Sequence, residues 1–267
     1  MFSRQELIDA IERADSIQPP VPGIVEYTQL PGVLLRVSPM DDPHFNEAIM
    51  ARFSASDADE GIDRVTDFYR SRKVRFSWIV GPSSSPADLG VRLLKRGFEK
   101  IQEVDGLFLP DLNADIAVNE AVRIVELSLD DLEPVVHVGA VGFGTSEEAS
   151  RAFNDMVRLR SASITTRVYI AFLDGVDYPI ACGYTTYYPD QPIALLCGGA
   201  TIPEFRGRGV YRSILAHRLS DIRRDGFEAV IIQADQETSS PICVRNGFEK
   251  VCEFQVYKWE SRRDQSS

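Results

Sequence analysis

The sequence is short of the residues that build metal sites and disulfide frameworks, since its 267 residues include three histidines and four cysteines. The cysteines form no C-x-x-C pair and stand apart from the histidines, so their spacing predicts no metal site. Cys182, Cys197 and Cys252 lie within apolar, strand-like segments. We therefore expect buried free thiols, which are typical of a reducing compartment.

Long hydrophobic runs and excess positive charge are also missing. No apolar run approaches the ~18 residues of a membrane span, and the opening MFSRQELIDAIERADS has no apolar signal-peptide core. The 29 Lys and Arg residues face 40 Asp and Glu residues, which gives a net charge of −11. Nucleic-acid binding without sequence preference needs basic side chains on phosphates. We expect a soluble, cytoplasmic protein without a nucleic-acid or membrane partner, whose acidic surface suits a cationic substrate.

One corner of the sequence occurs twice. RGFEKIQE (96–103) is nearly repeated by NGFEKVCE (246–253), and each is preceded by a helix-like segment that opens with SSP, at 84–86 and 239–241. Both copies follow the order strand, SSP, helix, GFEK, strand. Matching corners within a matching order of elements favour an internal duplication over chance.

Hydrophobic periodicity predicts further elements in each half. In the first half it predicts a helix capped by Ser3 and Glu6. Two strands (23–30 and 32–39) and two helices (43–52 and 57–72) follow. A strand (75–81), a helix (86–96) and a strand (98–109) complete this half. In the second half it predicts a strand (121–129), a helix (130–140) and a second helix that ends near residue 159. A meander of three strands (166–173, 179–188 and 192–202) and a long helix that ends at residue 226 follow. A strand (229–234), a helix (240–246) and a strand (248–259) complete the chain.

The segment PDLNADIAVNE (110–120) is polar and aperiodic, and it is read as a linker. A chain of this length with 44% hydrophobic residues can build two cores. The predicted fold class is α/β, of the α+β mixed-sheet type. It comprises two tandem domains, residues 1–115 and 116–267, with mostly antiparallel sheets flanked by helices.

Only the second half has a glycine-rich loop between a strand and a long helix, in CGGATIPEFRGRGVYRSIL (197–215). Pro203 ends the strand, and the glycines that follow let the backbone approach a ligand. The first N–H groups of a helix and its dipole favour an anion, to which Arg206 and Arg208 add charge. The loop predicts a phosphate or pyrophosphate site. A strand stop followed by a tight turn, with no ligand, is the alternative.

Two common phosphate loops are excluded by their missing residues. The loop lacks the Gly-Lys-Ser/Thr ending of a P-loop. It also has Arg212 where a dinucleotide-binding fingerprint needs a third Gly or Ala. The segment PEFRGRGVYRSIL instead resembles the acyl-CoA-binding loop of the GNAT superfamily of N-acetyltransferases, whose pattern is Gln/Arg-x-x-Gly-x-Gly/Ala.

The resemblance covers the whole second half, and the two-copy arrangement resembles tandem members whose first domain is degenerate. It implies acetyl-CoA as co-substrate, no metal, and transfer of an acetyl group to a primary amine of a small molecule or peptide. It further implies that the pantetheine arm pairs with a strand formed by Ala200, Thr201 and Ile202. The pyrophosphate would be wrapped by Arg206, Gly207, Arg208, Gly209, Val210 and Tyr211.

The sequence departs from the family pattern at several positions. Ser240 is the expected substitute for an Asn that the family often has after the next strand. Glu204 stands at the first position of the motif. Tyr211 stands where a small residue is common, and it is expected to restrict the pocket near the phosphates.

The catalytic residues of the family do not carry over. Cys243 occupies the position where many members have a Tyr acid, and an inward-packed cysteine is the alternative reading. Tyr188 is a second weak candidate, on a strand whose alternation puts Tyr184 on the same face and Tyr187 on the other. Packing or solvent is the alternative fate for all three tyrosines. The strand before the loop carries no Glu to act as base.

The histidines are expected to be structural. His217 shares a helix face with Ser213, Asp221 and Arg224, opposite an apolar stripe, and this face is predicted to be solvated. His137 lies in a helix that in the family often borders the acceptor site.

Two rival functions remain. The missing Tyr and Glu motivate a non-catalytic acyl-CoA-binding regulatory module, and a scaffold with a relic loop is a third reading, against which the loop arginines speak. The first copy is expected to bind no cofactor, because RVSPMDDPHF (36–45) has no Gly-x-Gly.

Overall fold

The computed structural model describes residues 2–114 and 116–259. In the first half the elements are α1 (Arg4–Glu12), a 3₁₀ turn (Arg13–Asp15), β1 (Glu26–Leu30), β2 (Val33–Val37), β3 (Glu47–Ile49), α2 (Ala58–Arg72), β4 (Phe76–Val80), α3 (Leu89–Lys95) and β5 (Glu99–Leu109). The predicted cap of α1 is confirmed, since Glu6 N–H donates to Ser3 Oγ and Ser3 N–H to Glu6 Oε2.

The second half follows the predicted order closely. Its elements are β6 (Val122–Leu127), α4 (Glu133–Phe143), α5 (Glu147–Arg160), β7 (Thr166–Leu173), β8 (Ala181–Tyr187), β9 (Ile193–Thr201), a 3₁₀ turn (Pro203–Phe205), α6 (Val210–Arg224), β10 (Ala229–Asp235), α7 (Ser239–Arg245) and β11 (Glu249–Trp259). No helix in the described ranges is long and apolar enough to cross a membrane.

The strands form one mixed sheet in the order β1-β2-β3-β4-β11-β5-β10-β9-β8-β7-β6. The pairs β3–β4 and β9–β10 are parallel and the others antiparallel, which confirms the predicted mixed, mostly antiparallel class. Each half thus has a parallel pair followed by a helix and a closing strand. This shared topology supports the duplication that the repeated corner indicates.

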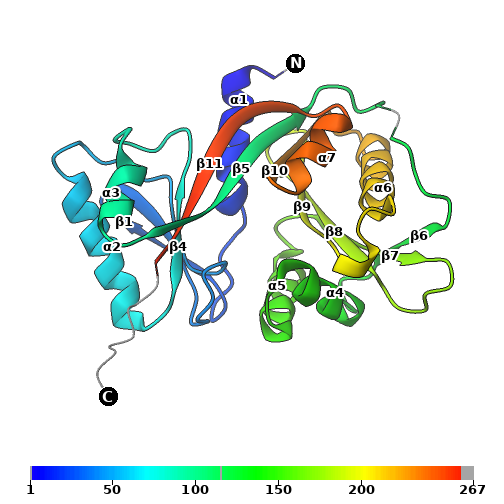
Figure 1. Cartoon of the computed structure of the whole chain (residues 1–267), viewed down its shortest axis with the longest axis horizontal. Helices are drawn as coiled ribbons and strands as arrows, with labels where there is room; N and C mark the ends of the chain where they lie inside the picture. The colour runs from blue at the N-terminus through cyan, green and yellow to red at the C-terminus, as the bar shows by residue number, and fades with distance from the viewer. Residues whose placement is uncertain (1, 115, 260–267) are drawn as a thin grey trace.

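The two halves exchange their closing strands. β5 pairs with β10 of the second half, and the end of β11 pairs with β4 of the first, from Gln255↔Val80 to Trp259↔Phe76. β5 and β11 also pair with each other and cross between the halves as two long neighbouring strands (Figure 1). The two predicted sheets are therefore continuous. The division between residues 115 and 116 stays a prediction.

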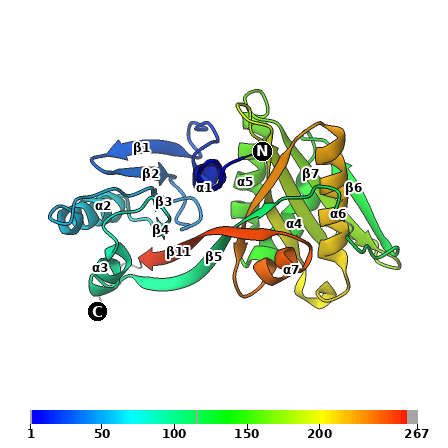
Figure 2. The same ribbon diagram turned by 90° about the horizontal axis from the view of Figure 1, so that it is seen from above.

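Helices cover both faces of the second half. α6 and α7 pack on one face around Leu215, Leu219 and Phe248. α4 and α5 pack on the other face, where α1 from the first half also lies against β9 and β10. Seen from above, α5 and α6 lie on opposite sides of the strands (Figure 2).

The predicted helix at 43–52 is wrong, because this segment contains the inner strand β3. Asn46 fixes the turn before it, donating to the carbonyl of Met40 at 2.7 Å and accepting from Ser38 N–H at 2.9 Å. Ala48 and Ile49 are buried between β2 and β4. A short apolar run fits a buried strand or a buried helix equally well, so periodicity did not decide.

Candidate functional site

The strands β9 and β10 diverge in the middle of the second half. Their parallel pairing runs from Ala229↔Ile193 to Ile232↔Leu196 and then ends. β9 continues to Thr201 along β8, and β10 continues to Asp235 along β5. We call the gap between residues 197–201 and 233–235 the splay. Along it β9 pairs with β8, and no strand in the described part of the chain pairs with its β10-facing edge.

A bulge in β9 lies at the start of the splay. The β8–β9 register shifts between Cys182↔Ala200 and Tyr184↔Cys197. Gly198, inside the bulge, has φ +56°, and a Cβ there would collide with the Tyr184 ring. The bulge therefore needs glycine for both conformation and space.

The loop after β9 delivers the N-terminus of α6 to the end of the splay. Gly207 and Gly209 have φ +76° and +77°, and Gly209 caps α6 without a side-chain hydrogen bond. A Cβ added to Gly207 would meet no atom within 4 Å, so open space borders the loop. Arg206, Arg208 and Arg212 are exposed around it. Free N–H groups beside three guanidinium groups suit an anion.

The loop is held from two sides. Arg206 Nε donates to the Thr201 carbonyl at 3.1 Å and Nη2 to the Gly142 carbonyl at 3.4 Å. Asn119, in the predicted linker, donates through Nδ2 to the Arg208 carbonyl at 2.9 Å. Its own N–H donates to Ser213 Oγ at 2.9 Å. Sequence reasoning missed Asn119, because a lone polar linker residue carries no signal of its contact.

The predicted pantetheine strand borders the splay as expected from its position. Ala200 and Ile202 are buried against α4 and α5. Thr201 Oγ1 is buried with no hydrogen-bond partner among the described residues. A buried hydroxyl without a partner is costly, so this position has an unmet hydrogen-bonding group.

Tyr211 and Cys243 meet across the splay. The Tyr211 ring edge lies 3.2 Å from where a Gly199 Cβ would be, and its hydroxyl lies 3.7 Å from Cys243 Sγ. Burial raises the pKa of both groups, so both are neutral proton donors at pH 7. Cys243 is fully buried against α6, as the packing alternative expected.

Two other predicted residues have structural partners. Ser240 is buried, and its hydroxyl donates to Asp105 Oδ2 at 2.5 Å. Tyr188 is buried, and its hydroxyl donates to the Ala10 carbonyl of α1 at 2.7 Å. These contacts give both hydroxyls a partner within the protein, and the cofactor role of Ser240 and the catalytic role of Tyr188 stay predictions.

The strand tyrosines are packed on alternate faces as predicted. Tyr184 lies on the α4 and α5 face, where its hydroxyl donates to Asn154 Oδ1 at 2.6 Å. Tyr187 lies on the α6 face and donates to Asp225 Oδ2 at 3.1 Å. Burial is the main cause that raises the pKa of each phenol.

The predicted solvated face of α6 is only partly solvated. Ser213 and Asp221 are buried, because this face covers β6 and β7. Asp221 accepts from the Tyr169 hydroxyl at 2.9 Å, and half-exposed His217 lies 3.8 Å from it. His137 is exposed on α4, 3.4 Å from Glu147.

Arg218 is a second residue of the site that sequence reasoning missed. It is 1% exposed, and it contacts both β8 and β9 at the bulge. It stands three positions after Leu215 and four before Ile222, within the apolar stripe of α6. A basic residue on an apolar stripe was the available signal.

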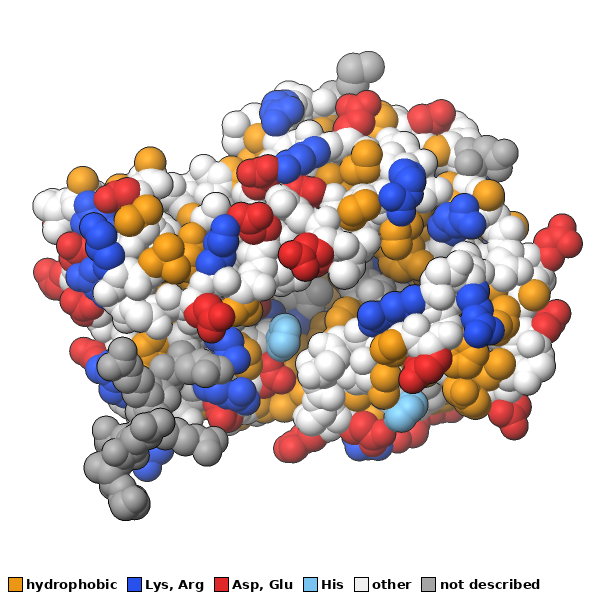
Figure 3. All heavy atoms as spheres, viewed as in Figure 1, with side chains coloured by type: hydrophobic (Ala, Val, Ile, Leu, Met, Phe, Trp, Pro, Cys, Tyr) orange, Lys and Arg blue, Asp and Glu red, His pale blue; other side chains and the backbone are white. Residues whose placement is uncertain are grey.

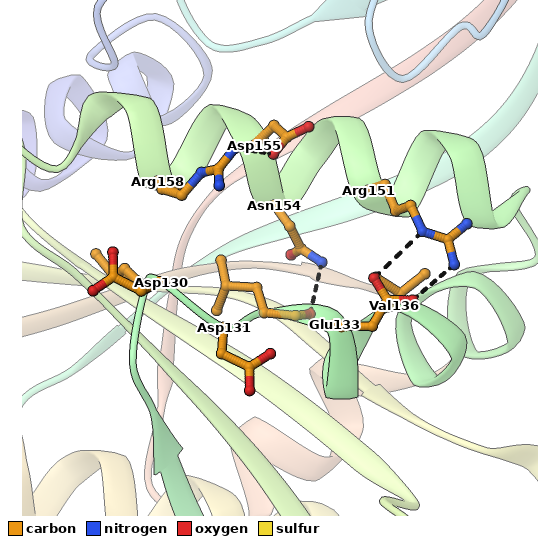
Figure 4. Close-up of a pocket in the computed structure, with 10 residues that line it drawn as sticks. Asp130, Asp131, Glu133, Val136, Arg151, Asn154, Asp155 and Arg158 are labelled. Atoms are coloured by element: carbon orange, nitrogen blue, oxygen red, sulfur yellow. Dashed lines mark hydrogen bonds and ion pairs between the residues drawn. The ribbon is translucent and has the colours of Figure 1, made fainter.

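Cavities border α4. One, about 650 Å³, adjoins the loop and is lined by apolar side chains with His137 and Glu204. A smaller one, about 230 Å³, lies between the start of α4 and α5 (Figure 4). There Arg151 bridges to Glu133 at 2.8 Å and Asn154 Nδ2 donates to the Leu132 carbonyl at 3.5 Å. These contacts tie α5 to the start of α4.

Among the described residues, the corresponding gap of the first half is closed. After β3, residues 51–53 pair with Ser85 beyond β4, through Ser85 N–H to the Ala51 carbonyl and Phe53 N–H to the Ser85 carbonyl. Phe53 fills the space beside Trp78. The loop that corresponds to 202–209 is therefore 50–57, not 36–45, and it too has no Gly-x-Gly. In the described ranges no cluster of three His, Cys, Asp or Glu side chains is placed to hold a metal ion.

Comparison with known proteins finds relatives by structure alone. No family model and no curated protein matches the sequence. A functionally unknown conserved protein from Staphylococcus epidermidis superposes with a TM-score of 0.68 at 12% identity, over 90% of this chain and 96% of its own. A GCN5-related N-acetyltransferase from Kribbella flavida gives 0.65 at 12%, over 89% and 90%. A tandem GNAT protein from the clavulanic acid biosynthesis pathway gives 0.62 at 16%, over 94% and 87%.

Proposed function

The chain has the tandem GNAT fold, and from this premise we propose that it is an N-acetyltransferase, with acetyl-CoA as donor and a primary amine of a small molecule or peptide as acceptor. The observation that carries the proposal is the splay, which ends at the glycine-rich start of α6. An unpaired strand edge suits an extended amide-bearing arm, and the helix start suits its diphosphate.

The residues present fit such a donor. Main-chain N–H groups at Gly207 and Gly209, with the nearby guanidinium groups, would hold the diphosphate, and the orphaned Thr201 hydroxyl would face the arm. The Tyr211 side chain lies across the splay, so on binding it either packs beside the pantetheine arm or rotates away from it. When bound, acetyl-CoA supplies a thioester whose acyl carbon an amine can attack.

The acceptor amine arrives from the face that carries α1, α4 and α5, because α6 and α7 cover the other face of the splay. A hollow opens in the surface between the two halves (Figure 3). The net charge of −11 favours the approach of an ammonium group.

Proton transfer to the leaving sulfur is assigned to the Tyr211 hydroxyl. It is neutral at pH 7, because burial raises its pKa, and it lies in the splay beside Cys243. Such a positioned donor contributes ~10²–10⁴-fold. A non-catalytic acyl-CoA-binding module is the second candidate, favoured by the burial of Cys243 at the family's acid position.

The test is release of free CoA thiol from acetyl-CoA with a panel of primary amines, run beside calorimetric binding of acetyl-CoA. Binding with thiol release on at least one amine is expected. Binding without release on any amine supports the non-catalytic module, and absence of binding contradicts both.

A further inference from the structure

Arg218 is a buried cation without an acidic partner. No carboxylate in the described part of the chain lies within ion-pair distance of its guanidinium, although the side chain is 1% exposed. Burial lowers its pKa, in keeping with this environment. A charge buried without a counter-charge is expensive, so its place in the fold calls for a reason beyond packing.

The guanidinium lies on the β9 bulge. Nη2 donates to the carbonyl groups of Tyr184 and Cys197, the latter at 3.3 Å, and Nε donates to Thr185 Oγ1 at 3.1 Å. A Cβ on Gly183 would lie 3.0 Å from Nη1, and one on Gly199 3.7 Å from it. The first distance is too short for an ordinary contact and the second is not, so Gly183 makes room for this group.

The bonds to Arg218 fix the direction of one peptide. Tyr188 N–H donates to the Ile193 carbonyl, and every second pair from there, through Tyr184↔Cys197, is of the kind whose carbonyls face the partner strand. The Cys197 carbonyl therefore points toward β8, and Arg218 Nη2 bonds it there together with the Tyr184 carbonyl. In a trans peptide the N–H points opposite to the carbonyl. The Gly198 N–H therefore points away from β8, toward the splay.

We propose that Arg218 is a positioning residue for acetyl transfer, a role that rests on the proposed function. It holds the Cys197–Gly198 peptide so that the Gly198 N–H meets the acyl oxygen of the thioester. In the reaction the amine lone pair forms the C–N bond, the C–S bond breaks, and the sulfur leaves with that electron pair. The sulfur takes the proton of the Tyr211 hydroxyl, and the proton that the amine nitrogen loses restores that hydroxyl through solvent. Negative charge gathers first on the acyl oxygen, where a fixed donor and a nearby cation stabilise it.

The test compares Arg218→Met and Arg218→Lys with the wild type, using kcat for thiol release and the Kd for acetyl-CoA. Arg218→Met should lower kcat ~10²-fold with Kd changed less than about threefold, because the donor is misaligned only toward the transition state. Arg218→Lys should recover part of the loss. Arg224→Met, on the exposed side of the same helix, is the matched control and should keep both values.

Arg218→Met with wild-type kcat contradicts the role of Arg218 while the proposed function stands. An inactive wild type contradicts the proposed function and this role with it. If Arg218→Met does not fold, Arg218→Lys decides, since a lower kcat at unchanged Kd supports the positioning role and a wild-type kcat contradicts it.

Discussion

At the scale of single residues, two proton-bearing side chains, Cys243 and Tyr211, lie in contact at the splay but differ in their surroundings. Cys243 Sγ is enclosed by the core behind α6 and α7, whereas Tyr211 spans the gap between β9 and α7. Burial raises the pKa of both, which excludes a thiolate nucleophile at neutral pH. The position where the GNAT superfamily often has its acid holds a buried thiol in this chain, and the Tyr211 hydroxyl from α6 lies 3.7 Å from it.

The pair gives a matched prediction. Cys243→Ala should cost about 1–2 kcal/mol of unfolding free energy and leave kcat near the wild-type value, because it removes buried contacts alone. Tyr211→Phe should lower kcat by ~10²-fold, because it removes the proton and keeps the ring. Chemical denaturation and thiol-release kinetics measure both variants. A large loss of kcat in folded Cys243→Ala would instead make the thiol the acid.

At the scale of elements, the loop before α6 could be predicted from the sequence, because the residues that shape and charge it are neighbours in the chain. One proline, two glycines and three arginines lie within residues 203–212. The glycines allow the backbone to turn, and the arginines make the loop positively charged. The helix start, Gly207 and Gly209 lie where the sequence predicts them. Strand β3 could not be predicted from its own residues, because it forms between β2 and β4, which are separate segments of the chain.

Gly207→Val tests this loop directly. The variant should abolish detectable acetyl-CoA binding, since a branched side chain would stand in the open space beside the N–H groups and φ +76° is strained for it. Glu204→Ala is the control and should change Kd little, because the main-chain donors remain. Calorimetry with acetyl-CoA measures both, and normal binding by a folded Gly207→Val would remove the diphosphate assignment.

At the scale of the whole molecule, the exchange of closing strands could not be predicted. The repeated corner places Gly-Phe and a strand at the end of each half, but it does not say which half that strand joins. Trp259, from the last strand, lies in the first-half core with Trp78. Each half is completed by a strand from the other, so neither has a full sheet alone.

This exchange predicts a single cooperative unfolding transition. Fluorescence of Trp78 and Trp259 reports the first-half core, and far-ultraviolet circular dichroism reports the whole chain. The two thermal midpoints should coincide, and acetyl-CoA at 100 times its Kd should raise both by about 5 °C although it binds in the second half. If acetyl-CoA left the midpoint of the tryptophan fluorescence transition unchanged, the two halves would unfold separately.

The most direct measurement of where the donor binds is amide hydrogen exchange of the full chain with and without acetyl-CoA. Exchange should slow in residues 197–211, which form the splay edge and the start of α6, and stay unchanged in residues 50–57, the corresponding loop of the first half. Unchanged exchange in 197–211, or protection confined to the first half, would contradict the assignment of the acetyl-CoA site.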